Sequence, residues 1–307
     1  MGSEAPVVSK HRIRFERDGA LIELAALDMG DPQRPVDVVF LHANGFNAAT
    51  YRSILLPLSD RLRIVAVDQQ GHGGSPQRTL SEGRTDALIF RDDLIGLLDQ
   101  TGGDTPLVLS GHSLGGCVAL LAAASAPERV KALTLFDPVI LPRDVAERTR
   151  RMDGSKTPDP VLVQKARARR AVFPSREAVF ASYRGRGAFA TWPDEVLHDY
   201  IEDAFRSRGD GEVELTCAPD WEAANFAAHG HDTWGAMEKI TVPVTILRAE
   251  TGSTCALTRS GDFPGPNPDV QVTTVAGASH FLPMERPDLV RAALLRATGA
   301  QTSRTYS

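Results

Sequence analysis

Residues 108–116 read Val-Leu-Ser-Gly-His-Ser-Leu-Gly-Gly, a buried-strand pattern that runs into a helix across the motif Gly-x-Ser-x-Gly. This strand–turn–helix context is typical of a nucleophile elbow. Because the serine sits in a tight, strained turn, a side chain at Gly111 or Gly115 would collide with the neighbouring strand or helix. The pattern predicts that the Ser113 hydroxyl projects into open space at a helix N-terminus, where unpaired amides favour a developing oxyanion.

On both sides of this motif, short apolar runs alternate with helix-length amphipathic stretches, which indicates a sheet covered by helices. Runs at 11–16 and 21–27 straddle Asp18-Gly19, a dipeptide that favours a hairpin turn. Six further runs have the pattern of buried parallel strands: 36–41, 63–67, 107–109, 132–136, 244–247 and 270–275. Helices are predicted over 85–100, 113–126 and 287–297. We therefore expect an α/β fold with a mostly parallel eight-stranded sheet flanked by helices.

The interval 141–239 breaks this alternation. It is rich in Arg, Ala and Asp, shows no buried-strand pattern, and contains helical stretches at 159–172 and 194–205. We therefore predict a core made of residues 1–140 and 240–307, with residues 141–239 inserted as a mostly helical cap or lid. The basic residues within 148–151 and 165–170 are expected to lie on solvated helix faces among Asp and Glu.

Composition narrows the class of partner. The 307 residues include 34 Lys and Arg against 39 Asp and Glu, a formal net charge of −5, which offers no counter-charge for a nucleic acid. The longest apolar run, 118–124, is too short for a membrane span, and the first residues contain no secretory apolar region. The three cysteines are widely spaced and read as reduced thiols. These patterns predict a cytoplasmic protein that binds no nucleic acid and has no membrane span, and they define no oligomeric state.

Two further motifs carry a resemblance to a known family. The segment 42–46 reads His-Ala-Asn-Gly-Phe after an early strand, and 68–75 reads Asp-Gln-Gln-Gly-His-Gly-Gly-Ser. With the serine motif they resemble the α/β-hydrolase superfamily, from about residue 20 to the C-terminal helix. The resemblance implies that the backbone amides of Asn44 and Leu114 form an oxyanion hole, although Ala43 stands where the family usually has glycine. It also implies structural roles for His42, Asp68 and His72.

A serine hydroxyl needs a base within hydrogen-bond reach, and this geometry calls for a histidine. Of the eight histidines, His280 follows the last strand run and precedes the last helix, where this fold places its base. Residues 229–232 read His-Gly-His-Asp and offer two candidate metal ligands without a third partner. We expect neither a metal nor an organic cofactor.

The acid of the predicted triad must accept the second N–H of the imidazole. Most relatives carry an aspartate in the turn after the strand that corresponds to 244–247, where this chain has Gly252 and Ser253. Asp137 stands at the end of the strand after the nucleophile's helix, a place from which some superfamily members, including certain haloalkane dehalogenases and lipases, supply the acid. We favour Asp137 and keep Glu250 as the alternative.

The resemblance implies a serine hydrolase, similar to esterases and lipases with a helical lid, that acts on a small apolar ester or lactone through an acyl-enzyme on Ser113. A serine at this position argues against dehalogenases and epoxide hydrolases, which use an aspartate. A carbon–carbon bond hydrolase of the same fold and a non-catalytic small-ligand-binding protein are the alternatives. Seven aromatic side chains of the insertion either line an acyl pocket or, the simpler interpretation for each, form the insertion's own core: Phe173, Phe180, Tyr183, Phe189, Trp192, Trp221 and Phe226.

Overall fold

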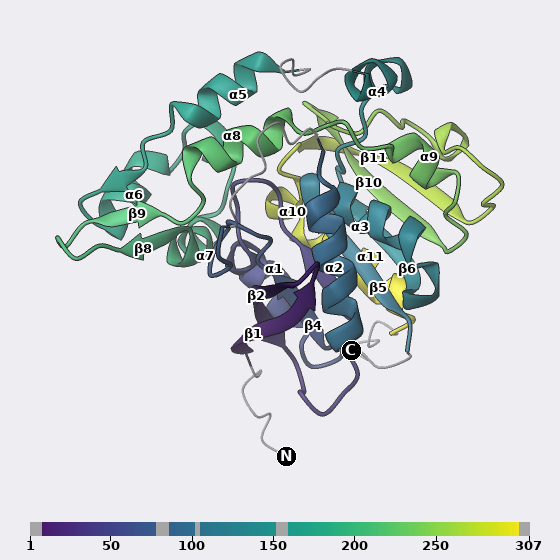
Figure 1. Cartoon of the computed structure of the whole chain (residues 1–307), viewed down its shortest axis with the longest axis horizontal. Helices are drawn as coiled ribbons and strands as arrows, with labels where there is room; N and C mark the ends of the chain where they lie inside the picture. The colour runs from purple at the N-terminus through teal and green to yellow at the C-terminus, as the bar shows by residue number, and fades with distance from the viewer. Residues whose placement is uncertain (1–7, 78–85, 102–104, 152–158, 301–307) are drawn as a thin grey trace, which may run out of the picture.

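The computed structural model describes residues 8–77, 86–101, 105–151 and 159–300, and its centre is an eight-stranded sheet (Figure 1). The two antiparallel pairings, β1 with β2 and β2 with β4, lie at one edge, and the remaining neighbours pair in parallel. The predicted mostly parallel sheet is confirmed. In spatial order its strands are β1 (Val8–Arg17), β2 (Ala20–Met29), β4 (Ile64–Val67), β3 (Val38–Leu41), β5 (Leu107–His112), β6 (Val130–Phe136), β10 (Val244–Thr251) and β11 (Val270–Ser279).

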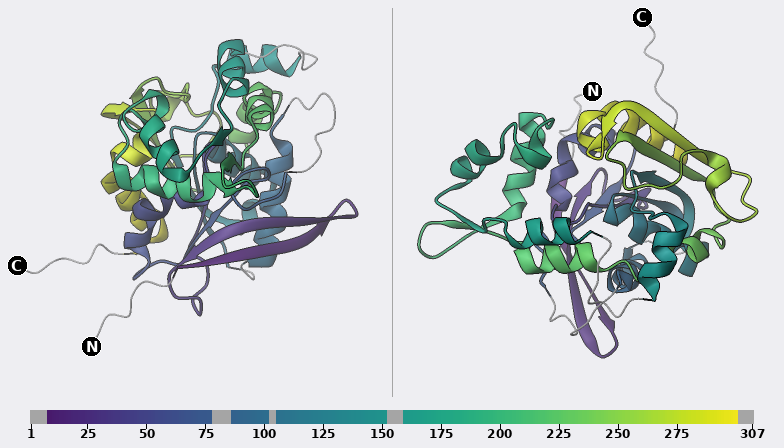
Figure 2. Two further views of the ribbon diagram at one scale, coloured as in Figure 1. Left: turned by 90° about the vertical axis from the view of Figure 1, so that its left-hand side faces the viewer. Right: turned by 90° about the horizontal axis from the view of Figure 1, so that it is seen from above.

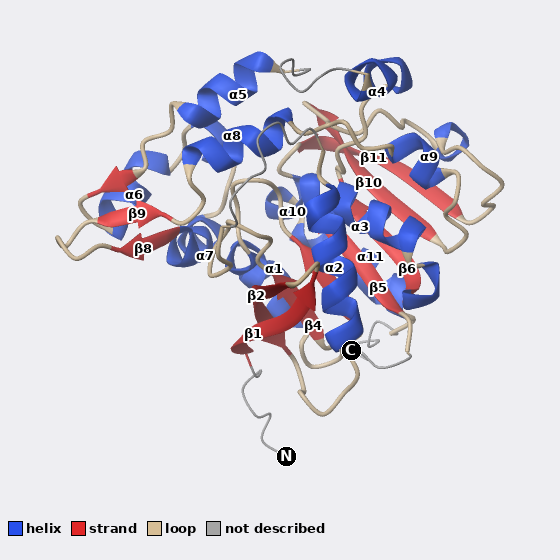
Figure 3. Cartoon of the chain, in the orientation of Figure 1, coloured by secondary structure: helices blue, strands red, loops and turns tan. Residues whose placement is uncertain are grey.

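Helices cover both faces of this sheet (Figures 2 and 3). Successive residues of β3 point to opposite faces. Val39 and Leu41 join the apolar cluster that contains α2 (Leu88–Thr101) and α3 (Leu114–Ser125). Val38 and Phe40 join the cluster that contains α1 (Arg52–Leu55), α10 (Leu282–Glu285) and α11 (Pro287–Thr298). Because both faces are covered, strands β3 and β4 are apolar at every position rather than alternating.

The hairpin at the edge of the sheet follows from its turn residues. Asp18 and Gly19 have φ of 52° and 73°, the left-handed backbone that a two-residue turn between twisted strands requires. The register places Arg17 opposite Ala20 and Val8 opposite Met29. The predicted hairpin is therefore confirmed, and Figure 2 shows it extending away from the rest of the sheet.

The described residues of the interval 141–239, here called the insertion, contribute no strand to the large sheet. They form α4 (Arg143–Arg150), α5 (Pro160–Arg167), α6 (Arg176–Tyr183), α7 (Asp194–Ala204), α8 (Pro219–Ala227) and α9 (Thr233–Met237). They also form a three-stranded antiparallel sheet of β7 (Val172–Phe173), β9 (Val213–Leu215) and β8 (Phe205–Ser207). Strands of two or three residues are too short to show a two-residue period, so they cannot be predicted from the sequence pattern. The helix predicted over 159–172 ends at Arg167, because Val172 pairs in this small sheet.

Within the described ranges, no helix combines the length and the apolar character needed to cross a membrane. The three cysteines are buried and form no disulfide.

Candidate active site

Ser113 lies between the last residue of β5 and the first residue of α3, with φ of 57° and ψ of −118°. The backbone of a residue other than glycine is strained at these φ and ψ angles. A Cβ atom added at Gly111 would collide with the backbone of Gly115, and one added at Gly115 would collide with the carbonyl oxygen of Leu41. The steric reason for the two glycines is therefore confirmed.

Three predicted site residues lie in hydrogen-bond contact. The Nε2 atom of His280 is 3.1 Å from the Oγ atom of Ser113, and its Nδ1 atom is 2.6 Å from the Oδ2 atom of Asp137. Both distances are within hydrogen-bond range. His280 directly follows β11 and Asp137 directly follows β6, so the three side chains meet at the carboxyl ends of strands β5, β6 and β11. This edge of an open parallel sheet is where ligands generally bind.

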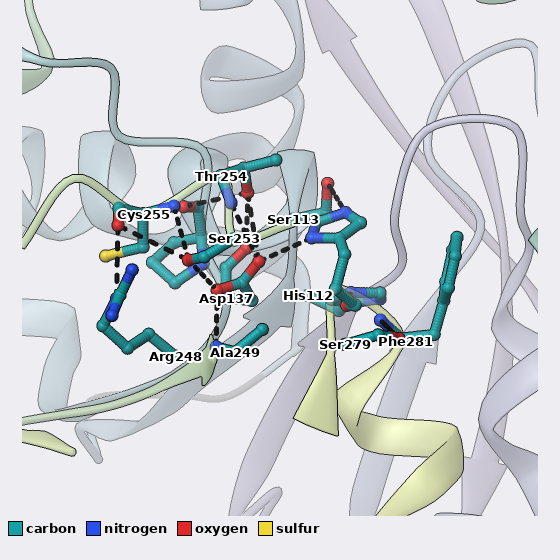
Figure 4. A network of polar contacts seen from close by, with 12 residues as sticks. His112, Ser113, Asp137, Arg248, Ala249, Ser253, Thr254, Cys255, Ser279 and Phe281 are labelled. Carbon is teal, nitrogen blue, oxygen red and sulfur yellow. Dashed lines mark hydrogen bonds and ion pairs between the residues drawn. The ribbon is translucent and has the colours of Figure 1, made fainter. Parts of the chain in front are cut away.

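The turn after β10 supplies hydrogen-bond donors to Asp137. Its Oδ1 atom accepts from the amide of Ala249 at 2.8 Å and from the hydroxyl of Ser253, and Oδ2 accepts from the amide of Thr254 at 3.0 Å (Figure 4). Burial raises the pKa of Asp137, but the hydrogen bond and charge of His280, with those donors, outweigh it and hold the pKa below its usual value. The carboxylate is therefore ionised. The turn after β10, which holds Gly252 and Ser253 rather than an aspartate, supplies hydrogen-bond donors to it.

Glu250, the alternative acid, points elsewhere. Its Oε2 atom accepts a hydrogen bond from the amide of Gly277 at 2.9 Å, and its side chain is exposed. Of the two candidate acids, Asp137 is the one that contacts His280 within the described part of the chain.

The two candidate oxyanion donors flank the serine. Leu114 is the first residue of α3, so its N–H has no acceptor within the helix. Asn44 lies in the loop after β3, and its side chain bridges to the insertion: Nδ2 donates to the carbonyl of Glu222 at 2.9 Å, and Oδ1 accepts from Asn225 at 3.0 Å. The loop is thus held between the core and α8.

Ala43 fits this loop without strain. The residues with positive φ other than glycine in the described ranges are Asp18, Ser113 and Asp137, so Ala43 keeps an ordinary backbone. Gly45, two residues on, is the loop position that needs glycine, because its φ is 75° and a Cβ atom would press on the Glu222 carboxylate.

The other motif residues support this loop and its neighbour. The Nε2 atom of His72 accepts from the amide of Gly45 at 3.1 Å, and the Nε2 atom of His42 accepts from the amide of Gln69 at 2.9 Å. Asp68 accepts from the amides of Ala48 and Gly74, at 2.7 Å and 2.8 Å. The expected structural roles of His42, Asp68 and His72 agree with these contacts.

A cavity of about 920 Å³ lies against Ser113 and His280 and is walled by both the core and the insertion. This volume is in the range of small-molecule sites, which are mostly apolar with a few placed polar groups. The core and the insertion both contribute apolar side chains: Phe46, Val139, Ile140, Leu141, Val145, Leu162, Phe226 and Phe281.

Of the seven aromatic residues considered above, Phe226 lines this cavity. Five others pack in the apolar cluster that includes α7: Phe173, Phe180, Tyr183, Phe189 and Trp192. The sixth, Trp221, packs in the cluster around α3 and donates to the carbonyl of Gln70 at 3.0 Å. Five of the seven therefore pack in an apolar core instead of lining the cavity, and Trp221 belongs to the main core rather than to a core of the insertion.

One basic residue lies differently from the expected solvated face. Arg169 lines the cavity and donates to Glu222, at 2.5 Å, and to the hydroxyl of Tyr200, at 2.9 Å. Glu222 comes from α8, more than 50 residues away along the chain, so no helical spacing could reveal this pair. Lys165 and Arg248 also line the cavity, and neither has a carboxylate partner among the described residues.

The histidines at 229 and 231 do not meet at one metal-like site. His229 lines the cavity, whereas the Nε2 atom of His231 lies 3.2 Å from the Sγ atom of Cys117. In the ranges that the structure describes, no group of three His, Cys, Asp or Glu side chains has the arrangement needed to hold a metal ion.

Comparison with known proteins places the chain in a family. The model of the "Alpha/beta hydrolase family" matches residues 38–293. The 2-(acetamidomethylene)succinate hydrolase of Mesorhizobium japonicum is 27% identical over 296 residues, which covers 96% of this chain and 98% of the relative. A crystal structure of E-2-(acetamidomethylene)succinate hydrolase superposes with a TM-score of 0.76 at 24% identity, over 96% of this chain and 100% of that one. The thioesterase domain from the curacin biosynthetic pathway superposes with a TM-score of 0.70 at 19% identity, over 94% and 99% of the two chains. Because the family model spans most of the sequence and the fold agrees, this chain belongs to the alpha/beta hydrolase family.

Proposed function

We propose that this hydrolase cleaves a small carboxylic ester or lactone through an acyl-enzyme on Ser113. The observation that supports this proposal is the unbroken chain of hydrogen bonds from Ser113 through His280 to Asp137, at the wall of a largely apolar cavity. A nucleophile, a base and an orienting acid in this arrangement support acyl transfer to serine.

Each group has one task in the proposed reaction. His280 takes the proton of the Ser113 hydroxyl as the oxygen attacks the substrate carbonyl, and Asp137 stabilises the resulting imidazolium. The tetrahedral oxyanion accepts hydrogen bonds from the amides of Asn44 and Leu114. His280 then donates its proton to the leaving group, and water attacks the acyl-enzyme with His280 again acting as the base.

The direct test uses short p-nitrophenyl esters and a fluorophosphonate probe that labels activated serines. The wild-type chain should turn over the esters and be labelled, whereas Ser113→Ala should lose both. Ser125→Ala is a matched control, because Ser125 ends the same helix and its hydroxyl bonds to the carbonyl of Leu121. Labelling that persists in Ser113→Ala would contradict the nucleophile, and an inert, unlabelled wild-type chain would favour the non-catalytic alternative.

A second candidate is hydrolysis of an amide in a substrate that carries a carboxylate. The Mesorhizobium relative is a 2-(acetamidomethylene)succinate hydrolase, so its substrate has an acetamido group and the carboxylates of succinate. In this chain the supporting observation is that Lys165 and Arg248 line the cavity with no carboxylate partner among the described residues.

A pair of esters of equal length tests whether the site recognises a carboxylate, as the second candidate requires: p-nitrophenyl hexanoate and the mono-p-nitrophenyl ester of adipic acid. If a carboxylate is recognised, Lys165→Gln and Arg248→Gln should each lower kcat/KM for the adipate ester up to about fivefold, the effect of a partly exposed ion pair. The hexanoate ester should be unaffected. Equal effects on both esters would argue against a carboxylate site.

A further inference from the structure

Behind the site, a chain of buried hydrogen bonds joins the oxyanion loop to the loop of the base. The amide of Ala43 donates to the hydroxyl of Tyr51 at 3.2 Å, and that hydroxyl lies 2.7 Å from the Nδ1 atom of His112. The Nε2 atom of His112 lies 2.7 Å from the carbonyl oxygen of His280. Tyr51 and His112 are fully buried. Ala43 precedes Asn44 and His112 precedes Ser113 in the sequence. This series of hydrogen bonds therefore includes the residue before the proposed oxyanion donor and the residue before the proposed nucleophile.

The direction of every hydrogen bond in this chain is determined. A carbonyl oxygen only accepts, so the Nε2 atom of His112 must carry its hydrogen. Burial, with the nearby charge of His280, lowers the pKa of His112 to about 3, so the ring is neutral and its Nδ1 atom accepts. Tyr51 must then donate to Nδ1 while its oxygen accepts from the amide of Ala43. The His112 tautomer with its hydrogen on Nε2 therefore gives every group in this series of hydrogen bonds a partner.

The surrounding contacts leave these two side chains little freedom. Tyr51 ends the 3₁₀ turn Ala48–Tyr51, and its ring centroid lies 4.7 Å from that of Phe40 in the central strand β3. The ring centroid of His112 lies 4.9 Å from that of His280. His112 therefore contacts the proposed base twice, through its ring and through its hydrogen bond to the main chain.

We propose that Tyr51 and His112 are positioning residues that hold the main chain of His280 and the loop of Asn44 in fixed relation around the reacting carbonyl. This inference rests on the proposed function. Base and oxyanion donor reach the site from loops far apart in the sequence, and a misplacement of about 1 Å can cost a hundredfold in rate. Because the hydrogen bonds of Tyr51 and His112 go to the main chain of Ala43 and His280 and not to a reacting atom, these two side chains act through Asn44 and His280.

The test measures kcat and KM for a p-nitrophenyl ester in Tyr51→Phe, His112→Leu and His112→Gln. Loss of a buried hydrogen bond in this chain should lower kcat about tenfold in Tyr51→Phe and His112→Leu, with KM within about twofold. His112→Gln should retain more activity than His112→Leu, because its amide keeps one donor and one acceptor. The double variant Tyr51→Phe/His112→Leu should lose no more than His112→Leu, since both changes break the same chain.

Ser110→Ala is the matched control. Ser110 lies in the same strand, is fully buried and donates to the carbonyl of Thr134 at 2.7 Å, outside this chain of hydrogen bonds. It should lower Tm and leave kcat unchanged. If His112→Leu fails to fold, Tyr51→Phe and His112→Gln provide the test.

Two results would overturn the inference: a kcat in Tyr51→Phe equal to that of Ser110→Ala, or losses that add in the double variant. Fluorophosphonate labelling separates this failure from that of the proposed function. A wild-type chain that is not labelled refutes the serine hydrolase itself. Equal labelling rates in the wild type, Tyr51→Phe and His112→Gln refute only the positioning role.

Discussion

Replacing Asp137 by asparagine tests the proposed triad at its least expected member. In the structure, Oδ2 accepts from His280 and Thr254, and Oδ1 accepts from Ala249 and Ser253, so all four hydrogen-bond partners are donors. An asparagine must place its NH₂ group against two of these donors, whichever way the amide is turned.

The two orientations of the amide have different consequences. With NH₂ in the place of Oδ2, His280 must move its proton to Nε2, where it can no longer accept the proton of Ser113. With NH₂ in the place of Oδ1, the buried amide of Ala249 loses its acceptor, at a cost of about 1–3 kcal/mol. A base held in the wrong tautomer loses about 10⁴-fold in kcat, and we expect Asp137→Asn to approach that loss.

The assay is the kcat for p-nitrophenyl butyrate, with Glu250→Gln as the matched carboxylate-to-amide control. Glu250 is exposed, and its bond from the amide of Gly277 survives in glutamine, so kcat should stay within about twofold. A loss below tenfold in Asp137→Asn, or a larger loss in Glu250→Gln, would refute the assignment of Asp137 as the acid.

Two further predictions concern stability. Gly111→Ala should lower the free energy of unfolding, measured in urea, by roughly 2–4 kcal/mol, because the new Cβ atom collides with the backbone of Gly115. Gly209→Ala is the control and should change this free energy little, because a Cβ atom at Gly209 meets no other atom. Equal effects of the two substitutions would contradict the steric account of the elbow. Burial raises the pKa of the Asp68 carboxyl group to about 6 from an ordinary 3.8. The folded chain therefore binds the carboxyl proton more tightly than the unfolded chain, and the stability that this group contributes is lost as pH rises through about 6. The Tm of Asp68→Asn relative to wild type should therefore increase between pH 4 and 7, and a constant difference would contradict this sign.

The elements that could be predicted are those whose signal is local. Every predicted strand of the large sheet is present, because a buried strand shows its apolar run within five to ten residues, whatever its partner. The elbow at Ser113 is equally local, since its two glycines clear a backbone contact within one strand–turn–helix unit. The short strands β7, β8 and β9 were missed, because so few residues show no period.

Contacts between distant segments could not be predicted. Arg169 belongs to a basic cluster that looks solvated, yet the structure pairs it with Glu222 in the cavity wall. Tyr51 belongs to no motif, and His112 is only the variable residue of the serine motif. The hydroxyl of Tyr51 nevertheless lies 2.7 Å from the Nδ1 atom of His112, although 61 positions separate the two residues in the sequence.

The sequence by itself therefore determined the sheet, the turn that carries Ser113 and the loop that carries His280, because strand periodicity, glycine sterics and chain order are properties of short segments. Which carboxylate lies against His280 was decided only by the tertiary structure. Asp137 and Glu250 lie at the ends of the neighbouring strands β6 and β10, and the backbone of Asp137, at φ of 41°, directs its side chain to the imidazole while Glu250 points to Gly277. The direction of a side chain at a strand end depends on backbone angles and packing partners from the whole fold, and no run of neighbouring residues encodes them.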